Sequence, residues 1–119
     1  MRKQIKETTM REQTKYQLQQ LQKAMEELAL WQAVAPEAAA FDSVEPFCID
    51  TMNAYEWLQW VFIPRMYAVI ESNEPLPHKM AIVPYIEEAL KEKDIVEVQR
   101  LIEPLKAIEE ICSAQNDRA

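Results

Sequence analysis

The sequence contains no glycine in 119 residues, and this absence excludes several classes of protein. Glycine supplies positive φ and lets a backbone approach a phosphate closely. Walker loops, dinucleotide-binding fingerprints and nucleophile elbows of the usual kind are therefore excluded. Asn-Gly and Asp-Gly hairpin turns are missing too, which argues against an all-β fold. The chain is instead rich in Leu, Glu, Gln, Lys and Ala, which favour helices.

Histidine and cysteine are scarce, with one His and two Cys. Cys48 and Cys112 lie in dissimilar contexts without CxxC spacing, so we expect reduced thiols, no metal site and no cofactor. His78 stands beside no evident nucleophile, and no pair of carboxylates suggests acid/base chemistry. The sequence therefore predicts no catalytic residues and favours a protein that is not an enzyme.

Long apolar runs are also lacking, and a run such as WVFI at residues 60–63 has only four residues. It is far too short to span a membrane, and the first residues, MRKQIKETTM, do not form a signal peptide. We expect a cytoplasmic protein. The net charge is +2 over residues 1–30 and −9 over residues 31–119. Because an acidic body repels phosphate, we expect no direct binding of nucleic acid.

The apolar periodicity predicts an all-α fold, a compact four-helix bundle without a sheet. The four predicted helices are a long first helix over residues 9–34, a central apolar helix over 53–72 with a proline kink, a short third helix over 84–93 and a fourth helix after residue 94. Capping boxes and a proline mark their starts: Thr9 with Glu12, Asn53 with Glu56, Pro84, and Asp94 with Glu97.

The bundle is predicted to be a single domain over residues 10–113. A flexible extension over residues 1–9 precedes it, and a loose tail over residues 114–119 follows it. The connection between the first two helices is long for a bundle, and we expect Phe41 and Phe47 to pin it.

The segment YEWLQWVFIPRMY at residues 55–67 is the main candidate site. It is apolar on all sides, which is typical of a surrounded helix, and Pro64 removes the amide that would bond the Trp60 carbonyl. Arg65 follows directly. Two interpretations are open. Arg65 and the tryptophans form an anion or peptide pocket at the bend, or Arg65 is structural and either reaches the surface or pairs with Asp42, Glu45 or Asp50 of the first loop. We predict the pairing.

Four stretches resemble the YqcC-like family, small bacterial proteins of unknown function: PFCIDTM at 46–52, EWLQWVFIPRM at 56–66, EPLP at 74–77 and PYIEEAL at 84–90. The resemblance runs from about Phe41 to Leu90. It implies an all-α bundle and no established activity. Family members are often encoded next to a tRNA pseudouridine synthase, which implies a partner or accessory role. The residues singled out as a binding or structural motif are Asp50, Trp57, Trp60, Pro64, Arg65 and Tyr85.

Two functions follow from these features. The first is a non-enzymatic interaction protein that docks on another protein, with a tRNA pseudouridine synthase as the candidate partner, because an acidic body complements a basic surface. It requires an exposed apolar patch. The alternative is a small-anion or peptide binder with a pocket at the Pro64 bend, lined by Trp57 or Trp60 with Arg65 at its edge. The sequence does not predict the oligomeric state.

Overall fold

The chain folds into helices, with two long connections, one between the first and second α-helices and one between the third and fourth. The structure is a computed structural model that describes the backbone of residues 2–114 and the side chains from residue 9 onward. The α-helices are α1 (Arg2–Glu27), α2 (Ala54–Trp57), α3 (Ile63–Glu71), α4 (Ile82–Ala89) and α5 (Ile95–Ala114). Three short helical segments are η1 (Ala38–Asp42), η2 (Pro46–Cys48) and the π-helical η3 (Leu58–Phe62).

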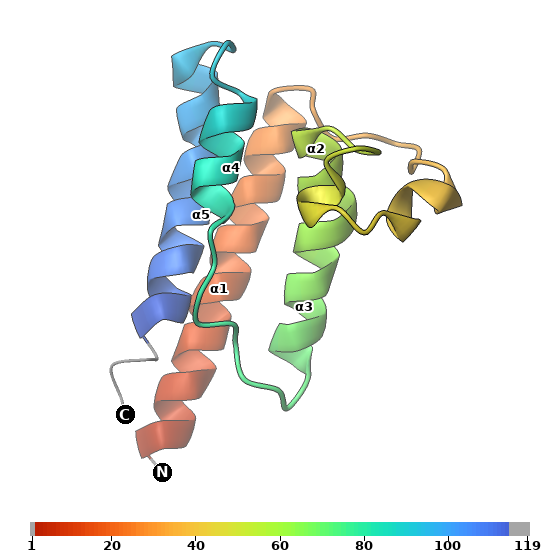
Figure 1. Cartoon of the computed structure of the whole chain (residues 1–119). Coiled ribbons are helices and arrows are strands. Elements are labelled where there is room, and N and C mark those ends of the chain that lie inside the picture. Colours follow the sequence, from red (N-terminus) through yellow and green to blue (C-terminus); the bar gives the residue numbers. More distant parts are fainter. Residues whose placement is uncertain (1, 115–119) are drawn as a thin grey trace.

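The helix α1 is the centre of the bundle and packs against two antiparallel neighbours (Figure 1). One side of α1 contacts α5 and another contacts α3, while α4 lies on α5. Because α2, η3 and α3 form one continuous run, the described residues make four helices and no strand, which confirms the predicted all-α bundle. The fully buried core residues include Leu18, Leu21, Met25, Leu58, Ile86, Leu101, Ile102, Leu105 and Ile108.

The end of α1 departs from the prediction. The amides of Ala29 and Leu30 donate to the carbonyls of Glu26 (3.1 Å) and Met25 (2.8 Å), the hydrogen-bond pattern of a Schellman motif. Ala29 has a φ of 62°, the left-handed conformation that glycine usually fills. Because this chain uses alanine there, the sequence carries no recognisable stop signal. The predicted end of the helix at Val34 is therefore wrong.

Ala29→Gly is expected to raise the free energy of unfolding by about 1 kcal/mol, because it removes the clash between Cβ and the carbonyl in the left-handed conformation. Chemical denaturation measures the change. Ala33→Gly is the matched control, because Ala33 is exposed and is not among the residues with positive φ. There glycine is expected to lower the free energy of unfolding by about 0.5 kcal/mol, because it raises the conformational entropy of the unfolded chain. Equal losses in the two variants would contradict the assignment.

The start of α1 also differs from the prediction. The backbone of α1 is helical from Arg2, so Thr9 lies within the helix and does not cap it. The segment predicted as a flexible extension, residues 1–9, thus belongs to α1 from Arg2 on. At the other end α5 continues to Ala114, and the rest of the predicted loose tail over 114–119 lies outside the described residues. The domain bounds of 10–113 stay a prediction.

The central helix begins as predicted. The Asn53 side chain accepts from the amide of Glu56 (2.8 Å), and the Glu56 carboxylate accepts from the amide of Asn53 (3.0 Å), which completes a capping box. Before Pro64 the helix widens into the π-helical turn η3, in which the Ile63 amide donates to the Leu58 carbonyl. A π-turn is one of the known ways in which a helix accommodates a disturbance of its hydrogen-bond ladder.

The helix α4 begins at Ile82, before the start predicted at Pro84. Its N-cap residue makes no side-chain cap. Instead, Glu109 on α5 accepts hydrogen bonds from the amides of Ile82 (2.6 Å) and Val83 (3.0 Å). A carboxylate satisfies free amides and interacts favourably with the positive end of the helix dipole. The cap comes from a distant part of the sequence, which is why local signals missed it.

Candidate functional site

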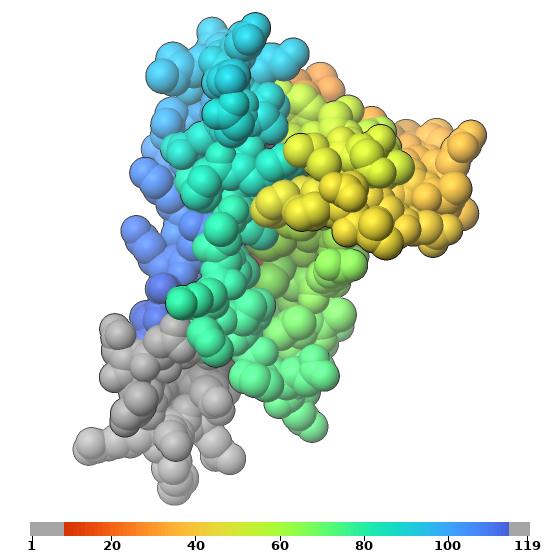
Figure 2. All heavy atoms as spheres, in the orientation of Figure 1, coloured from red at the N-terminus to blue at the C-terminus, as the bar shows by residue number. Residues whose placement is uncertain are grey.

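Four exposed large apolar residues lie on the connection between α1 and α2. We call residues 34–50 the lobe, because they project from the bundle beside α2 (Figure 1, Figure 2). Val44 is 94% exposed, Val34 78%, Ile49 59% and Phe41 40%. An exposed set of large apolar side chains on one segment is typical of a protein-interaction surface. The lobe thus exposes four large apolar side chains within 16 residues of one another.

The lobe is also acidic. Glu37, Asp42, Glu45 and Asp50 are all exposed, and residues 34–50 contain no Lys or Arg. Carboxylates interspersed with apolar side chains suit a partner surface that is basic around an apolar centre. The sequence carried this signal, since acidic residues are interspersed with large apolar ones along the loop. Sequence reasoning instead assigned the loop's phenylalanines to pinning and did not identify the valines.

An aromatic cluster anchors the lobe to the bundle. The ring of Phe47 stacks on Tyr85 with a centroid distance of 4.1 Å and meets Trp57 edge-on at 5.0 Å. Trp57 in turn stacks near Phe62 at 5.6 Å. Such pairs add roughly 0.5–1.5 kcal/mol each beyond their buried area. The predicted pin at Phe47 is confirmed, whereas Phe41 is exposed and packs as an apolar surface residue.

Two of the predicted site residues, Trp57 and Tyr85, therefore meet in this cluster. Trp57 is buried, and burial raises the pKa of the Tyr85 hydroxyl, with a smaller contribution from Cys48 beside it. Three of the stretches that resemble the YqcC-like family come together here, since Phe47, Trp57 and Tyr85 each belong to a different one. Their arrangement supports the lobe and gives no sign of chemistry.

The backbone of the lobe is held in a specific conformation. Phe47 and Cys48 have φ values of 59° and 49°, so two successive residues are left-handed without being glycine. Such residues cost of order 1 kcal/mol each and persist where the surroundings fix them. The Ser43 hydroxyl donates to Asp50, and the Thr51 hydroxyl donates to the Ala40 carbonyl at 2.7 Å. These contacts make the lobe a preformed surface.

A buried glutamine clamp ties the start of the lobe to the central helix. Gln59 is 5% exposed, and its amide group accepts from the Gln32 backbone amide and donates to the Gln32 carbonyl, both at 2.7 Å. The Gln32 side chain accepts from the Trp60 indole at 3.0 Å. The predicted site residue Trp60 is thus part of a satisfied polar network. Gln59 was the single polar residue of its stretch, and that isolation was the signal for the clamp.

The predicted pairing of Arg65 is wrong. Arg65 is exposed, and within residues 9–114 the structure gives it no ion pair. Asp50, one of its three expected partners, accepts from Ser43 within the lobe. In contrast, Arg11 on α1 does make long-range contacts, because it donates to the carbonyls of Val69 (2.8 Å) and Ile70 (3.1 Å) at the end of α3. Helical spacing placed Arg65 near the apolar side, but the side chain leaves it.

Truncation of the two arginines is expected to change the free energy of unfolding by different amounts. Arg65→Ala should change the free energy of unfolding by less than about 0.5 kcal/mol, as is usual for an exposed side chain without partners. Arg11→Ala should lower it by roughly 2 kcal/mol, because half-buried carbonyls lose a charged donor. Urea denaturation of both variants measures this. A larger loss for Arg65→Ala than for Arg11→Ala would contradict the assignment.

A shallow hollow of about 510 Å³ lies beside Pro64 and Trp60. Its other lining residues are Gln22, Trp31, Gln32, Ala33, Gln59, Ile63 and Tyr67. None of them is charged, so Arg65 does not stand at its edge as predicted. Trp57 points to the aromatic cluster and does not line it either. The hollow has aromatic walls but lacks the cationic anchor that an anion site needs.

In the described part of the chain, no three His, Cys, Asp or Glu side chains are grouped so that they could hold a metal ion. Burial, with a smaller contribution from Glu109, raises the pKa of the Cys112 thiol to about 11, so this thiol is protonated at neutral pH. Among the described helices, none is long and apolar enough to cross a membrane.

Comparison with known proteins shows which family the chain is related to. A family model, DUF446, which bears the description tRNA pseudouridine synthase C, matches residues 13–111. An uncharacterized protein of Haemophilus influenzae is 61% identical over 102 residues, which are 86% of this chain and 94% of that protein. The uncharacterized protein YqcC of Escherichia coli is 42% identical over 82 residues, 69% of this chain and 75% of that one.

A solved structure of one relative supports this relationship. The solution NMR structure of Escherichia coli YqcC matches with a TM-score of 0.78 and 33% identity, over 88% of this chain and 89% of that one. A further match is a protein of Pectobacterium carotovorum named tRNA pseudouridine synthase C, 49% identical over 65 residues. These residues are 55% of this chain but only 17% of that protein.

Proposed function

The chain belongs to the DUF446 family, the YqcC-like proteins, and on this premise we propose that it is a non-enzymatic accessory protein that docks on a tRNA pseudouridine synthase. It acts in the cytoplasm and contacts the enzyme, not the RNA. The lobe at residues 34–50 is the docking surface. The observation that carries this proposal is the combination of four exposed large apolar side chains and four carboxylates on one preformed segment.

The charge of the chain supports the choice of partner. An enzyme that binds tRNA presents a basic surface to phosphate, and an acidic body with a net charge of −7 is attracted to such a protein. The uncompensated carboxylates of the lobe steer the encounter, while Val44 and Ile49 supply the apolar area that holds the complex. Association should accordingly be fast and sensitive to salt.

The match to the Pectobacterium protein supports the same partner. In that protein a segment similar to this chain is a small part of a polypeptide named tRNA pseudouridine synthase C. Two modules on one polypeptide meet at a high effective concentration. Where the module is a separate chain, a docking surface of its own must replace the covalent link. The lobe fits this requirement. The match does not carry the enzyme's activity, because most of that protein lies outside it.

The alternative, a small-anion binder at the Pro64 bend, loses its support because no charged residue lines the hollow there. An uncharged peptide is the remaining ligand class for that hollow. A tryptophan fluorescence titration with short peptides addresses it, since Trp31 and Trp60 form the walls.

The proposed function is tested by isothermal titration of the purified chain with purified tRNA pseudouridine synthase C of the same organism, at low and at high salt. The expected result is a one-to-one complex whose affinity falls as salt rises. Prior treatment of both proteins with nuclease should leave the complex intact. The absence of binding at low salt, or binding that disappears with nuclease, would contradict direct docking.

A further inference from the structure

A groove lies between α1 and α5, the helices that supply all the residues lining its central hollow, and no residue of the lobe lines it. Its central hollow, of about 530 Å³, shares Tyr16, Gln17 and Ala107 with a second hollow of about 480 Å³. On the other side it shares Arg100 and Glu103 with a third hollow of about 300 Å³. The first two hollows are therefore adjacent between the two helices, and the third continues along α5; we call the surface that they form the α1–α5 groove.

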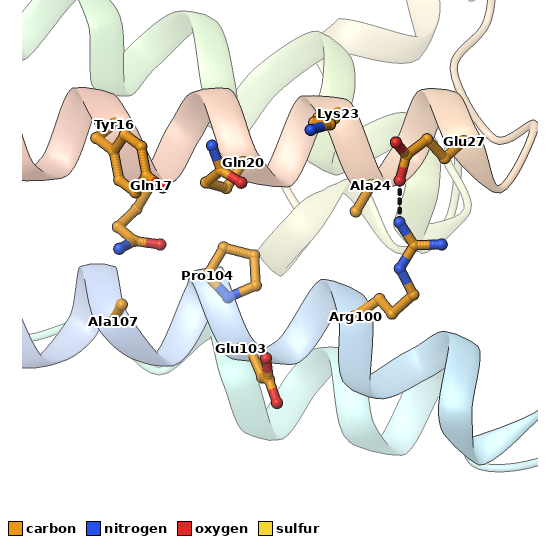
Figure 3. Close-up of a pocket in the computed structure, with 10 residues that line it drawn as sticks. All are labelled: Tyr16, Gln17, Gln20, Lys23, Ala24, Glu27, Arg100, Glu103, Pro104 and Ala107. Atoms are coloured by element: carbon orange, nitrogen blue, oxygen red, sulfur yellow. Dashed lines mark hydrogen bonds and ion pairs between the residues drawn. The ribbon is translucent and has the colours of Figure 1, made fainter.

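Small residues create this groove. Ala24 on α1 and Pro104 and Ala107 on α5 lie where larger side chains would close the space between the helices (Figure 3). Ala24 and Pro104 are buried at its floor. Tyr16 and Lys23 lie on the α1 side and Glu103 on the α5 side (Figure 3). The floor is thus shallow and apolar, with polar side chains along both edges.

The groove has apolar anchor points along its length. Tyr16, which is 55% exposed, stands where the central and second hollows meet. Ile95 and Val96, 73% and 69% exposed, stand at the far end. Exposed aromatic and aliphatic side chains around a shallow channel are the features that receive one apolar face of an amphipathic helix.

The charges along the groove indicate which charges a bound helix would carry. Arg100 is paired with Glu27, which leaves Lys23 as the remaining cation of the central hollow. Glu103 and Glu110 on α5 line the groove, are exposed and have no ion pair among residues 9–114. They are seven residues apart on one helix, so their Cα atoms are separated by roughly 10.5 Å along its axis. A bound helix with cations at the same spacing would form ion pairs with both carboxylates.

We propose that the α1–α5 groove binds one amphipathic helix of the partner protein, with Lys or Arg about seven residues apart beside its apolar face. Ile95 and Ile111 bound the groove, so the bound helix spans roughly 24 Å, or about four to five turns. A second acidic copy of this chain is disfavoured at this surface by the same carboxylates. The identity of the partner rests on the proposed function, whereas the chemistry of the groove does not.

The first test uses the complex with purified tRNA pseudouridine synthase C. Glu103→Lys with Glu110→Lys is expected to weaken binding roughly tenfold or more at low salt, as expected for charge complementarity at an interface. The matched control, Glu87→Lys with Glu92→Lys, makes the same change in net charge at exposed positions outside the groove, and its effect should be clearly smaller. Equal effects of the two pairs on a complex that forms would overturn the proposal.

The second test separates the groove from the proposed function. A synthetic helical peptide of about 17 residues, with a leucine stripe and Lys seven residues apart, is added to the chain and followed by amide NMR. Shifts should concentrate at Tyr16 and Ala107, and a peptide with Glu in place of Lys should produce weaker ones. Shifts elsewhere, or a groove filled by a second copy of this chain, would overturn the inference whether or not the synthase binds.

Discussion

Val44→Asp combined with Ile49→Asp should reduce the affinity for the tRNA pseudouridine synthase by about two orders of magnitude. Both side chains are largely exposed, so in the free chain they make few contacts that the change could break. In the complex each is expected to fill an apolar pocket of the partner, where a buried aspartate without a counterion is costly. The dissociation constant from isothermal titration measures the effect.

This result has two controls. The unfolding midpoint of the double variant should match that of the wild type, which excludes loss of the fold. Ala81→Asp with Ala89→Asp adds the same two charges at exposed positions of or next to α4 and should leave the dissociation constant nearly unchanged. If the lobe variant binds as well as the wild type, the lobe is not the docking surface.

Gln59→Leu should lower the free energy of unfolding by about 2–4 kcal/mol, because two backbone groups of Gln32 lose their partners in a half-buried position. Leucine has a similar size, so the loss reports hydrogen bonding more than packing. Urea denaturation measures it. Gln19→Leu on the exposed face of α1 is the matched control, and its effect should stay within about 0.5 kcal/mol.

The clamp also couples stability to docking. Gln32 lies just before the lobe, so the loss of its bonds to Gln59 should loosen the entry of the lobe. We expect Gln59→Leu to weaken synthase binding under conditions where the bundle is still folded. A variant that loses less than about 0.5 kcal/mol would show that the two bonds are replaced by water.

Local signals in the sequence predicted those parts of the fold that local chemistry determines. Asn53 caps the central helix, and Asp94 accepts from the amides of Val96 (2.9 Å) and Glu97 (3.1 Å) at the start of α5. Both are side chains that act within a few residues of themselves. The apolar stripes of the first and fourth helices are buried for the same reason, since helical periodicity alone decides which face they share.

Contacts between distant residues could not be predicted in this way. Glu109 on α5 accepts from the first amide of α4, and Arg11 on α1 donates to a carbonyl near the end of α3. Neither contact has a signal in the sequence next to the helix end that it caps. The left-handed Ala29 hid the end of α1, because a glycine is what usually reveals such a turn. Trp57 and Tyr85 were identified as candidate residues, but their convergence on Phe47 depends on how the elements pack.

The exposure of the lobe was hidden from sequence reasoning for a related reason. An apolar residue in a loop is usually assigned to the core, and Phe47 obeys this expectation while Val44 does not. Only the packed structure shows which apolar loop residue packs on the bundle and which one is exposed. Arg65 illustrates the reverse case, since a residue expected to be held against the bundle is free on its surface within the described chain.

Hydrogen–deuterium exchange of the chain, alone and saturated with purified tRNA pseudouridine synthase C, tests the docking of the lobe most directly. The account predicts slower exchange across residues 34–50 in the complex, with additional protection along α1 and α5 if the groove is also filled. Saturation with the synthase that leaves the exchange of residues 34–50 unchanged would contradict the account.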